Sequence, residues 1–172
     1  MILTTRTTLK RLEKADAHQM YAYASDEETT HYMDWPRHKS LDDTYRVIEH
    51  IGGLIAEGKN DGYAIHLNGH GMIGTIGMMW KEQDRVEIGY IINKLHWGKG
   101  IVTEVGNAFL AYIQETYPQI KLIEARCHTG NEASAIVMQK LGMEYKGFLP
   151  DEVFQNIDPE KKFPVRQYCL LL

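Results

Sequence analysis

The sequence predicts an α+β protein with a mixed sheet. Two apolar segments, residues 62–68 and 71–80, flank a short turn rich in residues that tolerate positive φ, which indicates a β-hairpin. A strand over residues 85–93 leads into a glycine loop and then into a helix from about Gly100 to Tyr117. The 172 residues, 44% hydrophobic and 24% charged, match one globular domain, so we expect a single domain over residues 1–172.

The N-terminal part is predicted to hold one strand followed by helices. Residues 6–12 fit a strand, and residues 16–32 fit one or two short helices. These helices end near Trp35-Pro36, because the residue before a proline leaves helical space. Ser40 is the expected N-cap of a helix over residues 41–58, in which the apolar residues follow helical spacing and a glycine forms the C-terminal stop.

The C-terminal part continues the alternation of strands and helices. Residues 121–127 fit a strand, and Asn131 is expected to cap a helix that ends at Leu141-Gly142. The last thirty residues fit two strands joined by a loop around Asn156 to Lys162. The resulting order, β-α-α-β-β-β-α-β-α-β-β, is typical of an α+β protein.

Charge and cysteine content exclude several classes of function. The chain has 19 basic and 23 acidic residues and a pI near 6.1, so we expect neither a nucleic-acid partner nor a membrane surface. Cys127 and Cys169 have no metal-ligand spacing, and His66 and His70 are expected to point apart, so no metal is predicted. Without a leader-like or spanning apolar segment, we expect a soluble cytoplasmic protein.

A glycine-containing loop is the most informative segment. In Trp97-Gly98-Lys99-Gly100 the glycines let the backbone approach a ligand closely, and the free N–H groups of the following helix suit a diphosphate. The alternative is that both glycines only serve a tight turn. The segment is not a P-loop, and Thr103 stands where the dinucleotide fingerprint has its third glycine, so ATP and NAD are disfavoured.

Four separate segments carry a family resemblance. They are Glu87-Ile-Gly-Tyr90, Trp97-Gly-Lys-Gly-Ile-Val-Thr-Glu104, Asn131-Glu-Ala-Ser134 and Lys140-Leu-Gly142-Met143. In order and spacing they resemble the GNAT superfamily of acyl-CoA-dependent N-acyltransferases, most closely its RimJ/RimL-type branch. The resemblance implies a mostly antiparallel sheet flanked by helices, with acetyl-CoA as co-substrate.

The resemblance also implies where acetyl-CoA binds. The phosphate loop of the superfamily falls on six consecutive residues, Trp97, Gly98, Lys99, Gly100, Ile101 and Val102, whose backbone amides would hold the CoA diphosphate. Val102 departs from the small residue usual at the last position. The backbone of Ile91 and Ile92 would pair with the pantetheine arm like an added strand, and Asn131 is counted among the cofactor-binding residues.

The implied reaction is direct attack of an amine on the thioester in a ternary complex, which requires a base and an acid. Glu87 is the candidate base, because strand alternation places it opposite an apolar face; the alternative is a solvated glutamate paired with Lys81. The tyrosine that many members use as acid is replaced by Met138, and in the RimJ/RimL branch the proposed donor maps onto Ser134. Alternatively, Asn131 and Ser134 are only an N-cap and the third helical residue.

The leading function is therefore acetyl transfer from acetyl-CoA to a primary amine. The acceptor is either a small-molecule amine, which the absence of a basic face favours, or a protein N-terminus. Tyr32, Trp35 and His38 are candidate linings of the acceptor pocket, with ordinary packing as the alternative. A non-catalytic acyl-CoA sensor and a structural partner protein are the alternative functions, and a homodimer through the C-terminal strands is a further expectation.

Overall fold

The computed structural model describes all residues, 1–172, and its centre is one eight-stranded sheet with the order β1-β2-β3-β4-β5-β6-β8-β7. The strands are β1 (Ile2–Leu3), β2 (Thr7–Lys10), β3 (Asn60–Leu67), β4 (Gly71–Glu82), β5 (Arg85–Ile92), β6 (Leu122–His128), β7 (Glu144–Phe154) and β8 (Asp158–Leu171). The α-helices are α1 (Ala17–Ala24), α2 (Glu27–Thr30), α3 (Leu41–Ala56), α4 (Ile101–Thr116) and α5 (Glu132–Lys140), with short 3₁₀ helices η1 (Lys14–Asp16) and η2 (Lys94–His96). The predicted α+β class with a mixed, mostly antiparallel sheet is confirmed.

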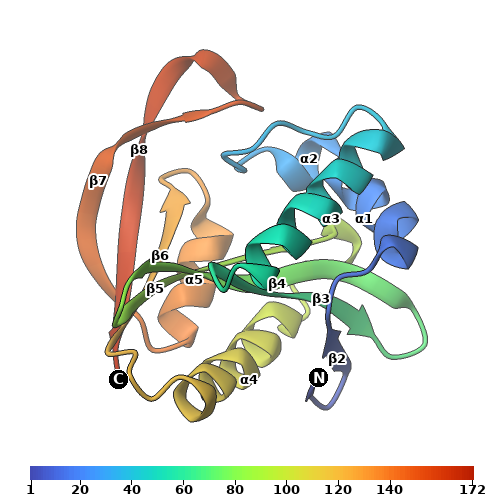
Figure 1. Cartoon of the computed structure of the whole chain (residues 1–172). Coiled ribbons are helices and arrows are strands. Elements are labelled where there is room, and N and C mark those ends of the chain that lie inside the picture. Colours follow the sequence, from blue (N-terminus) through green and yellow to red (C-terminus); the bar gives the residue numbers. More distant parts are fainter.

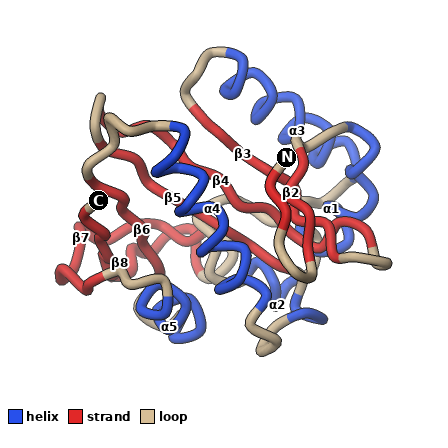
Figure 2. Tube along the Cα trace, turned by 90° about the horizontal axis from the view of Figure 1, so that it is seen from below, coloured by secondary structure: helices blue, strands red, loops and turns tan.

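Helices cover both faces of the sheet. In Figure 1, α1, α2 and α3 lie above it and α4 and α5 below it, and Figure 2 shows α4 and α5 from their own side. The larger core fills the α4/α5 side, where Phe109 and Met138 pack against strand residues such as Val86. A smaller core on the other side joins α1 and α3 to Ala64 and Met72.

β5 and β6 form the only parallel pair of strands, and they pair over only three residues each. Register pairs join Arg85 to Leu122, Val86 to Ile123 and Glu87 to Glu124, and none follows. Beyond this point β5 continues to pair with β4, while β6 pairs with β8 as far as His128. The two strands therefore separate directly after Glu87, and the backbone of β5 beyond it has an open edge.

Alternation along β5 follows the prediction. Val86, Ile88 and Ile92 are buried on the α4 side, whereas Glu87 and Gly89 lie on the face that carries α1 and α3. Ser40 caps α3 by accepting a hydrogen bond from the Asp43 N–H, as expected from the sequence.

Two expectations about the ends of the chain were wrong. The expected loop from Asn156 to Lys162 is a short turn, because β8 already begins at Asp158 and pairs with β7 in a long hairpin. The segment Asp158–Lys162 is polar on both faces, so it lacks the alternation that marks a half-buried strand. The first strand is shorter than residues 6–12, and the two-residue β1 was not expected. None of the helices has the length and apolar character that crossing a membrane requires.

Candidate functional site

Two adjoining pockets open where β5 and β6 separate. The larger, of about 930 Å³, lies between α2, the loop that precedes α4, and the beginning of α5. Eight of the nine residues predicted to bind the cofactor line it: Ile91, Ile92, Trp97, Gly98, Gly100, Ile101, Val102 and Asn131. Seven of these eight residues come from one segment, residues 90–103, and the rest of the lining comes from residues 26–33 and 130–140.

The start of α4 offers the cleft a run of free backbone donors. The N–H groups of the six residues from Gly98 to Thr103 donate to no acceptor within the protein. Gly98 and Gly100 adopt φ values of 70° and 71°, in the left-handed region that favours glycine, and Gly100 is the N-cap residue of α4. Free N–H groups at the positive end of a helix dipole bind anions such as a diphosphate.

Lys99 and Val102 both contact parts of the protein outside the cleft. Lys99 does not line the cleft, because its ammonium donates to the Leu95 carbonyl at 2.8 Å and its own carbonyl accepts from Arg6 at 2.8 Å. Val102 is half-buried and packs against the larger core, although it also borders the cleft. The larger residue at this position is therefore accommodated by core packing.

The open edge of β5 consists of Tyr90 and Ile92 rather than Ile91 and Ile92. The Asn93 N–H donates to the Ile73 carbonyl on β4 at 2.8 Å, so in the antiparallel ladder the backbone polar groups of Ile91 also face β4. Those of Ile92 face away from β4, and its carbonyl accepts from the indole N–H of Trp97 at 2.9 Å.

The smaller pocket, of about 310 Å³, reaches from the separation of β5 and β6 to the side of α3. It shares six residues with the larger cleft: Tyr32, Met33, Tyr90, Ile91, Asn131 and Ser134. Trp35 lines it as well, whereas His38 is buried outside it and its Nδ1 lies 2.9 Å from the Thr44 hydroxyl. Of the three aromatic candidates, His38 therefore serves packing.

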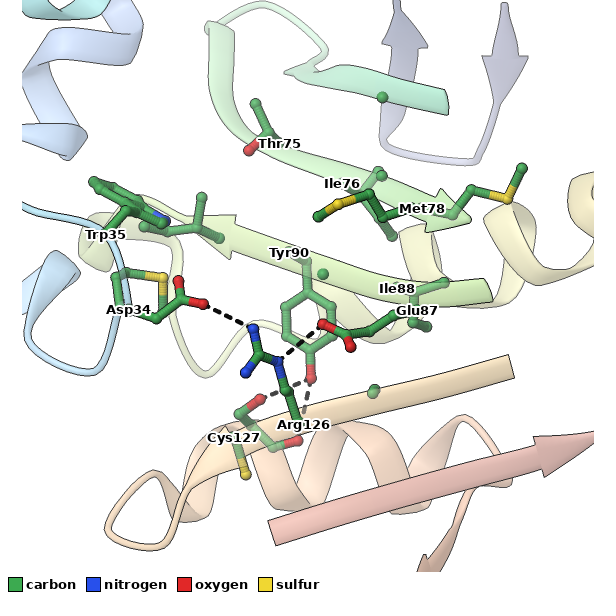
Figure 3. Close-up of a pocket in the computed structure, with 18 of the residues that line it drawn as sticks. Asp34, Trp35, Thr75, Ile76, Met78, Glu87, Ile88, Tyr90, Arg126 and Cys127 are labelled. Atoms are coloured by element: carbon green, nitrogen blue, oxygen red, sulfur yellow. Dashed lines mark hydrogen bonds and ion pairs between the residues drawn. The ribbon is translucent and has the colours of Figure 1, made fainter. Parts of the chain in front are cut away.

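Tyr90 and Ser134 meet at the junction of the two pockets. The Tyr90 hydroxyl lies 3.0 Å from Ser134 Oγ and 3.2 Å from the Ser134 carbonyl oxygen (Figure 3 shows the direction of the Tyr90 ring). Burial raises the pKa of Tyr90 well above its ordinary value. The Asn131 side chain accepts from the Ser134 N–H at 3.1 Å, so the predicted cap is present, yet it uses only the backbone of Ser134.

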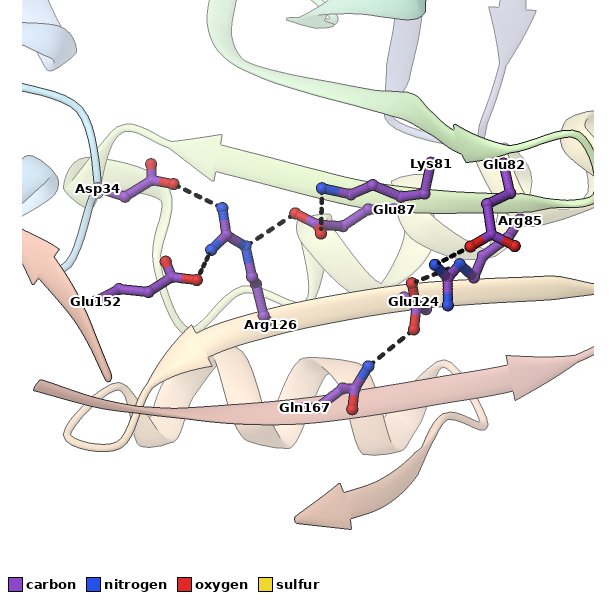
Figure 4. A network of polar contacts seen from close by, with 9 residues as sticks. All are labelled: Asp34, Lys81, Glu82, Arg85, Glu87, Glu124, Arg126, Glu152 and Gln167. Atoms are coloured by element: carbon purple, nitrogen blue, oxygen red, sulfur yellow. Dashed lines mark hydrogen bonds and ion pairs between the residues drawn. The ribbon is translucent and has the colours of Figure 1, made fainter. Parts of the chain in front are cut away.

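Glu87 is held by two cations at the mouth of the smaller pocket. Its carboxylate lies 2.9 Å from Lys81 Nζ and 2.9 Å from Arg126 Nε. The predicted pairing with Lys81 is thus present, but Glu87 also lines the pocket, so it is not merely solvated. Figures 3 and 4 show Arg126 reaching from β6 toward Glu87 across the separation of the strands.

Arg126 joins three carboxylates from distant parts of the chain. Besides Glu87 it binds Asp34 at 3.0 Å and Glu152, which come from the α2–α3 connection and from β7 (Figure 4). Sequence reasoning missed Arg126 and the hydroxyl of Tyr90. The signal for Tyr90 was available, because a tyrosine on an apolar strand face needs a partner for its hydroxyl. No group of histidine, cysteine or acidic residues in the structure could hold a metal.

Comparison with known proteins gives a consistent result. A family model described as "Acetyltransferase (GNAT) domain" matches residues 6–144. An uncharacterized N-acetyltransferase, p20 from Bacillus licheniformis, is 31% identical over 153 residues, which cover 87% of this chain and 85% of that protein.

Solved structures show the same fold at lower sequence identity. The structure titled RimL, ribosomal L7/L12 alpha-N-protein acetyltransferase in complex with coenzyme A, matches with a TM-score of 0.86 and 18% identity, covering 98% of this chain and 96% of that chain. Spermidine N-acetyltransferase from Vibrio cholerae, in complex with CoA and spermine, matches with a TM-score of 0.80 and 20% identity, covering 97% and 96%.

Proposed function

Because the chain belongs to the GNAT acetyltransferase family, we propose that it transfers the acetyl group of acetyl-CoA to a small-molecule primary amine that enters through the smaller pocket. The protein is an acetyl-CoA-dependent N-acetyltransferase. The observation that carries the proposal is the meeting of the two pockets at Tyr90 and Ser134, beside the Glu87 carboxylate.

Acetyl-CoA fits the larger cleft. The six free N–H groups from Gly98 to Thr103 suit its diphosphate, and the open edge at Tyr90 and Ile92 suits the amides of the pantetheine arm. The co-substrate supplies an activated acyl group, as a thioester. With the diphosphate at the start of α4 and the arm along β5, the reacting carbon would reach the junction of the pockets.

Proton transfer is assigned to residues on the two sides of that junction. The acceptor ammonium first gives up one proton, the free amine nitrogen then bonds to the thioester carbon, and the C–S bond breaks. A second proton leaves the nitrogen as the amide forms and one proton reaches the sulfur, so that one proton is released to solvent overall. Glu87 takes the proton of the ammonium, directly or through water, and the Ser134 hydroxyl donates to the leaving sulfur. Tyr90, 3.0 Å from Ser134 Oγ, holds that hydroxyl in position.

The acceptor pocket supports a small molecule rather than a protein N-terminus. Its volume of about 310 Å³ lies at the lower end of the range for small-molecule sites. The chain also has a net charge of −4, which gives no general attraction to a ribosome or another nucleic-acid assembly.

A calorimetric titration with acetyl-CoA tests the proposal, with ATP and NAD as controls. We expect micromolar binding, about −8 kcal/mol, selective over both nucleotides. CoA release in the presence of a panel of primary amines, measured with a thiol reagent, then tests transfer. Failure to bind acetyl-CoA at millimolar concentration, or binding without CoA release for any amine or N-terminal peptide, would contradict the proposal.

A further inference from the structure

The charges and shape of the smaller pocket restrict which primary amines can serve as the acceptor, if this pocket is the acceptor site as proposed above. Three carboxylates line its mouth, Asp34, Glu87 and Glu152, but only one cation, Arg126; Lys81, which pairs with Glu87, is not part of the lining. The excess of negative charge suits an incoming ammonium group.

Neither cation is free to bind an anionic group of the acceptor. The guanidinium of Arg126 donates through Nε to Glu87, through one terminal nitrogen to Glu152 and through the other to Asp34. Lys81 Nζ lies 2.9 Å from Glu87. A carboxylate or phosphate on the acceptor would find no unpaired cation among the residues lining the pocket, and it would lie close to three like charges.

The floor of the pocket beyond the mouth is made of glycine. In the register of the sheet Gly89 on β5 lies opposite Gly77 on β4, which lies opposite Gly62 on β3. All three line the pocket, and they change from exposed through half-buried to buried in that order. Since strands lie about 4.8 Å apart, the row spans about 10 Å across the sheet.

The pocket is open above Gly89, at the outer end of this floor, and it closes above Gly62, at the inner end. A Cβ atom at Gly89 would meet no heavy atom within 4 Å, whereas one at Gly62 would lie 3.0 Å from Asn60 Oδ1 and 3.7 Å from Ile51. The pocket therefore runs inward from Glu87 and Gly89 and ends at Asn60 and Ile51.

Apolar side chains form the walls. They are Leu12, Met33, Trp35, Ile51 and Met79, contributed by four separate segments of the chain. Met79 is 45% exposed, although the neighbouring strand positions Met78 and Ile76 are fully buried. An apolar body lying between these side chains would remove their surface from water.

The inner end carries one polar group without a partner. Asn60 Oδ1 is buried and accepts no hydrogen bond within the protein. A buried acceptor without a donor is costly, and a ligand group that donates to it would remove that cost.

We propose that the acceptor is a primary amine with an elongated, uncharged and largely apolar body. The amine lies at Glu87, the body crosses the row from Gly89 to Gly62, and the Asn60 side chain turns so that its Oδ1 accepts from a neutral donor, such as a hydroxyl, at the far end. Amino acids and phosphorylated amines are poor substrates under this assignment because their anionic groups find no unpaired cation. Polyamines are poor substrates because a second ammonium would lie between the apolar walls.

Four amines of equal chain length test the assignment directly. They are hexylamine, 6-aminohexan-1-ol, 1,6-diaminohexane and 6-aminohexanoate, which differ only in the far end. We expect kcat/KM to be about five- to tenfold higher for the alcohol than for hexylamine, and at least a hundredfold lower for the carboxylate than for the alcohol. From ethylamine to hexylamine, kcat/KM should rise by about fourfold for each added methylene that enters the pocket. A preference for the diamine or the carboxylate would overturn the assignment and leave acetyl transfer itself intact.

Two variants test whether the preference for chain length and for a terminal hydroxyl arises in this pocket. Gly89→Val fills the outer floor and should lower the ratio of kcat/KM for hexylamine to that for ethylamine at least tenfold. Asn60→Ala should bring the ratio for 6-aminohexan-1-ol to hexylamine close to one. Gly53→Ala is the matched control, because Gly53 lies on α3 with open space around it and does not line the pocket. Equal effects of Gly89→Val on both amines would overturn the assignment.

Measuring the binding of the amine tests this assignment independently of the proposed acetyl transfer. Calorimetry with 6-aminohexan-1-ol on protein saturated with CoA does not depend on turnover. Binding to the wild type that is lost in Gly89→Val supports the assignment even if no amine is acetylated. Absence of binding to the wild type overturns it, whereas failure of CoA itself to bind contradicts the proposed function.

Discussion

The guanidinium of Arg126 lies 2.9 Å from the carboxylate of Glu87, across the point where β5 and β6 cease to pair. The same guanidinium binds Asp34 and Glu152, so one side chain fixes the carboxylate on β5 relative to the α2–α3 connection and to β7. The position of Glu87 beside the junction of the pockets therefore depends on contacts that come from four parts of the chain.

Replacing Glu87 with glutamine is expected to lower kcat by about 10²- to 10⁴-fold, the usual contribution of a positioned base. The side chain keeps its shape and can still contact Arg126, so the dissociation constant of acetyl-CoA should not change. Steady-state rates and calorimetry on the same preparation measure both quantities. Unchanged turnover would remove Glu87 from the mechanism and leave it an ion-pair partner of Lys81 and Arg126.

Ser134→Ala and Tyr90→Phe are expected to act as one unit. Each should lower kcat with little change in KM for acetyl-CoA, and the double variant should be no slower than the slower single variant, because Tyr90 acts through the Ser134 hydroxyl. Ser134→Ala keeps the N–H that Asn131 accepts, so its thermal stability should stay close to that of the wild type.

The matching control for that pair is Asn131→Ala. It removes the cap of α5 and should cost about 1 kcal/mol in the free energy of unfolding, measured by denaturant titration. If Ser134→Ala lost stability to the same extent and retained full specific activity, the serine would be only a helix-start residue.

Gly100→Ala is expected to weaken acetyl-CoA binding. The residue has a φ of 71°, which costs a non-glycine residue about 1–2 kcal/mol, and relief of that strain would reorient the free N–H groups at the start of α4. The dissociation constant should rise about five- to thirtyfold. Gly58→Ala is the control, because Gly58 has a φ of 69° and open space but lies after α3, outside the cleft. Equal loss of affinity in both variants would point to general destabilisation.

The contact between α2 and η2 predicts a measurable acid titration. A hydrogen bond from Lys94, together with the Thr29 N–H, lowers the pKa of Asp26 from 3.8 to about 2. Because this pKa is depressed in the folded state, the contact stabilises the protein above about pH 4 and is lost as the pH falls toward 2. Carboxyl NMR should place the midpoint of Asp26 near 2 in the wild type and closer to 3.8 in Lys94→Met. The same midpoint in both proteins would contradict the assigned cause.

The parts of the site that are local in sequence could be predicted. Gly98, Gly100 and the cap residue Asn131 could be recognised because helix capping and free N–H groups at a helix start depend only on residues next to one another in the sequence. Arg126 could not be found in this way, because its partners stand 92 and 39 residues before it and 26 residues after it. An isolated arginine on a strand has the same local pattern whether or not distant carboxylates surround it.

The glycine floor could not be predicted either, because it too is formed by residues far apart in the sequence. Gly62, Gly77 and Gly89 are unremarkable individually, and only the register of three strands aligns them. That register passes through irregularities at Ile65/His66 and at Trp80/Glu82, which no periodicity in the sequence indicates. The expected loop at Asn156 to Lys162 failed for a related reason, since pairing with β7 overrides the polar composition of the start of β8.

Because β5 and β6 pair over so few residues, we also expect the sheet to open locally between these two strands. Only three register pairs connect the part of the sheet formed by residues 2–92 with the part formed by residues 122–171. Backbone amides along this line should exchange with solvent deuterium sooner than those in the interior of the β3–β4 or β6–β8 ladders, and acetyl-CoA bound across the line should slow that exchange. The line along which β5 and β6 separate is then the weakest connection between these two parts of the sheet, and we expect bound acetyl-CoA to strengthen it.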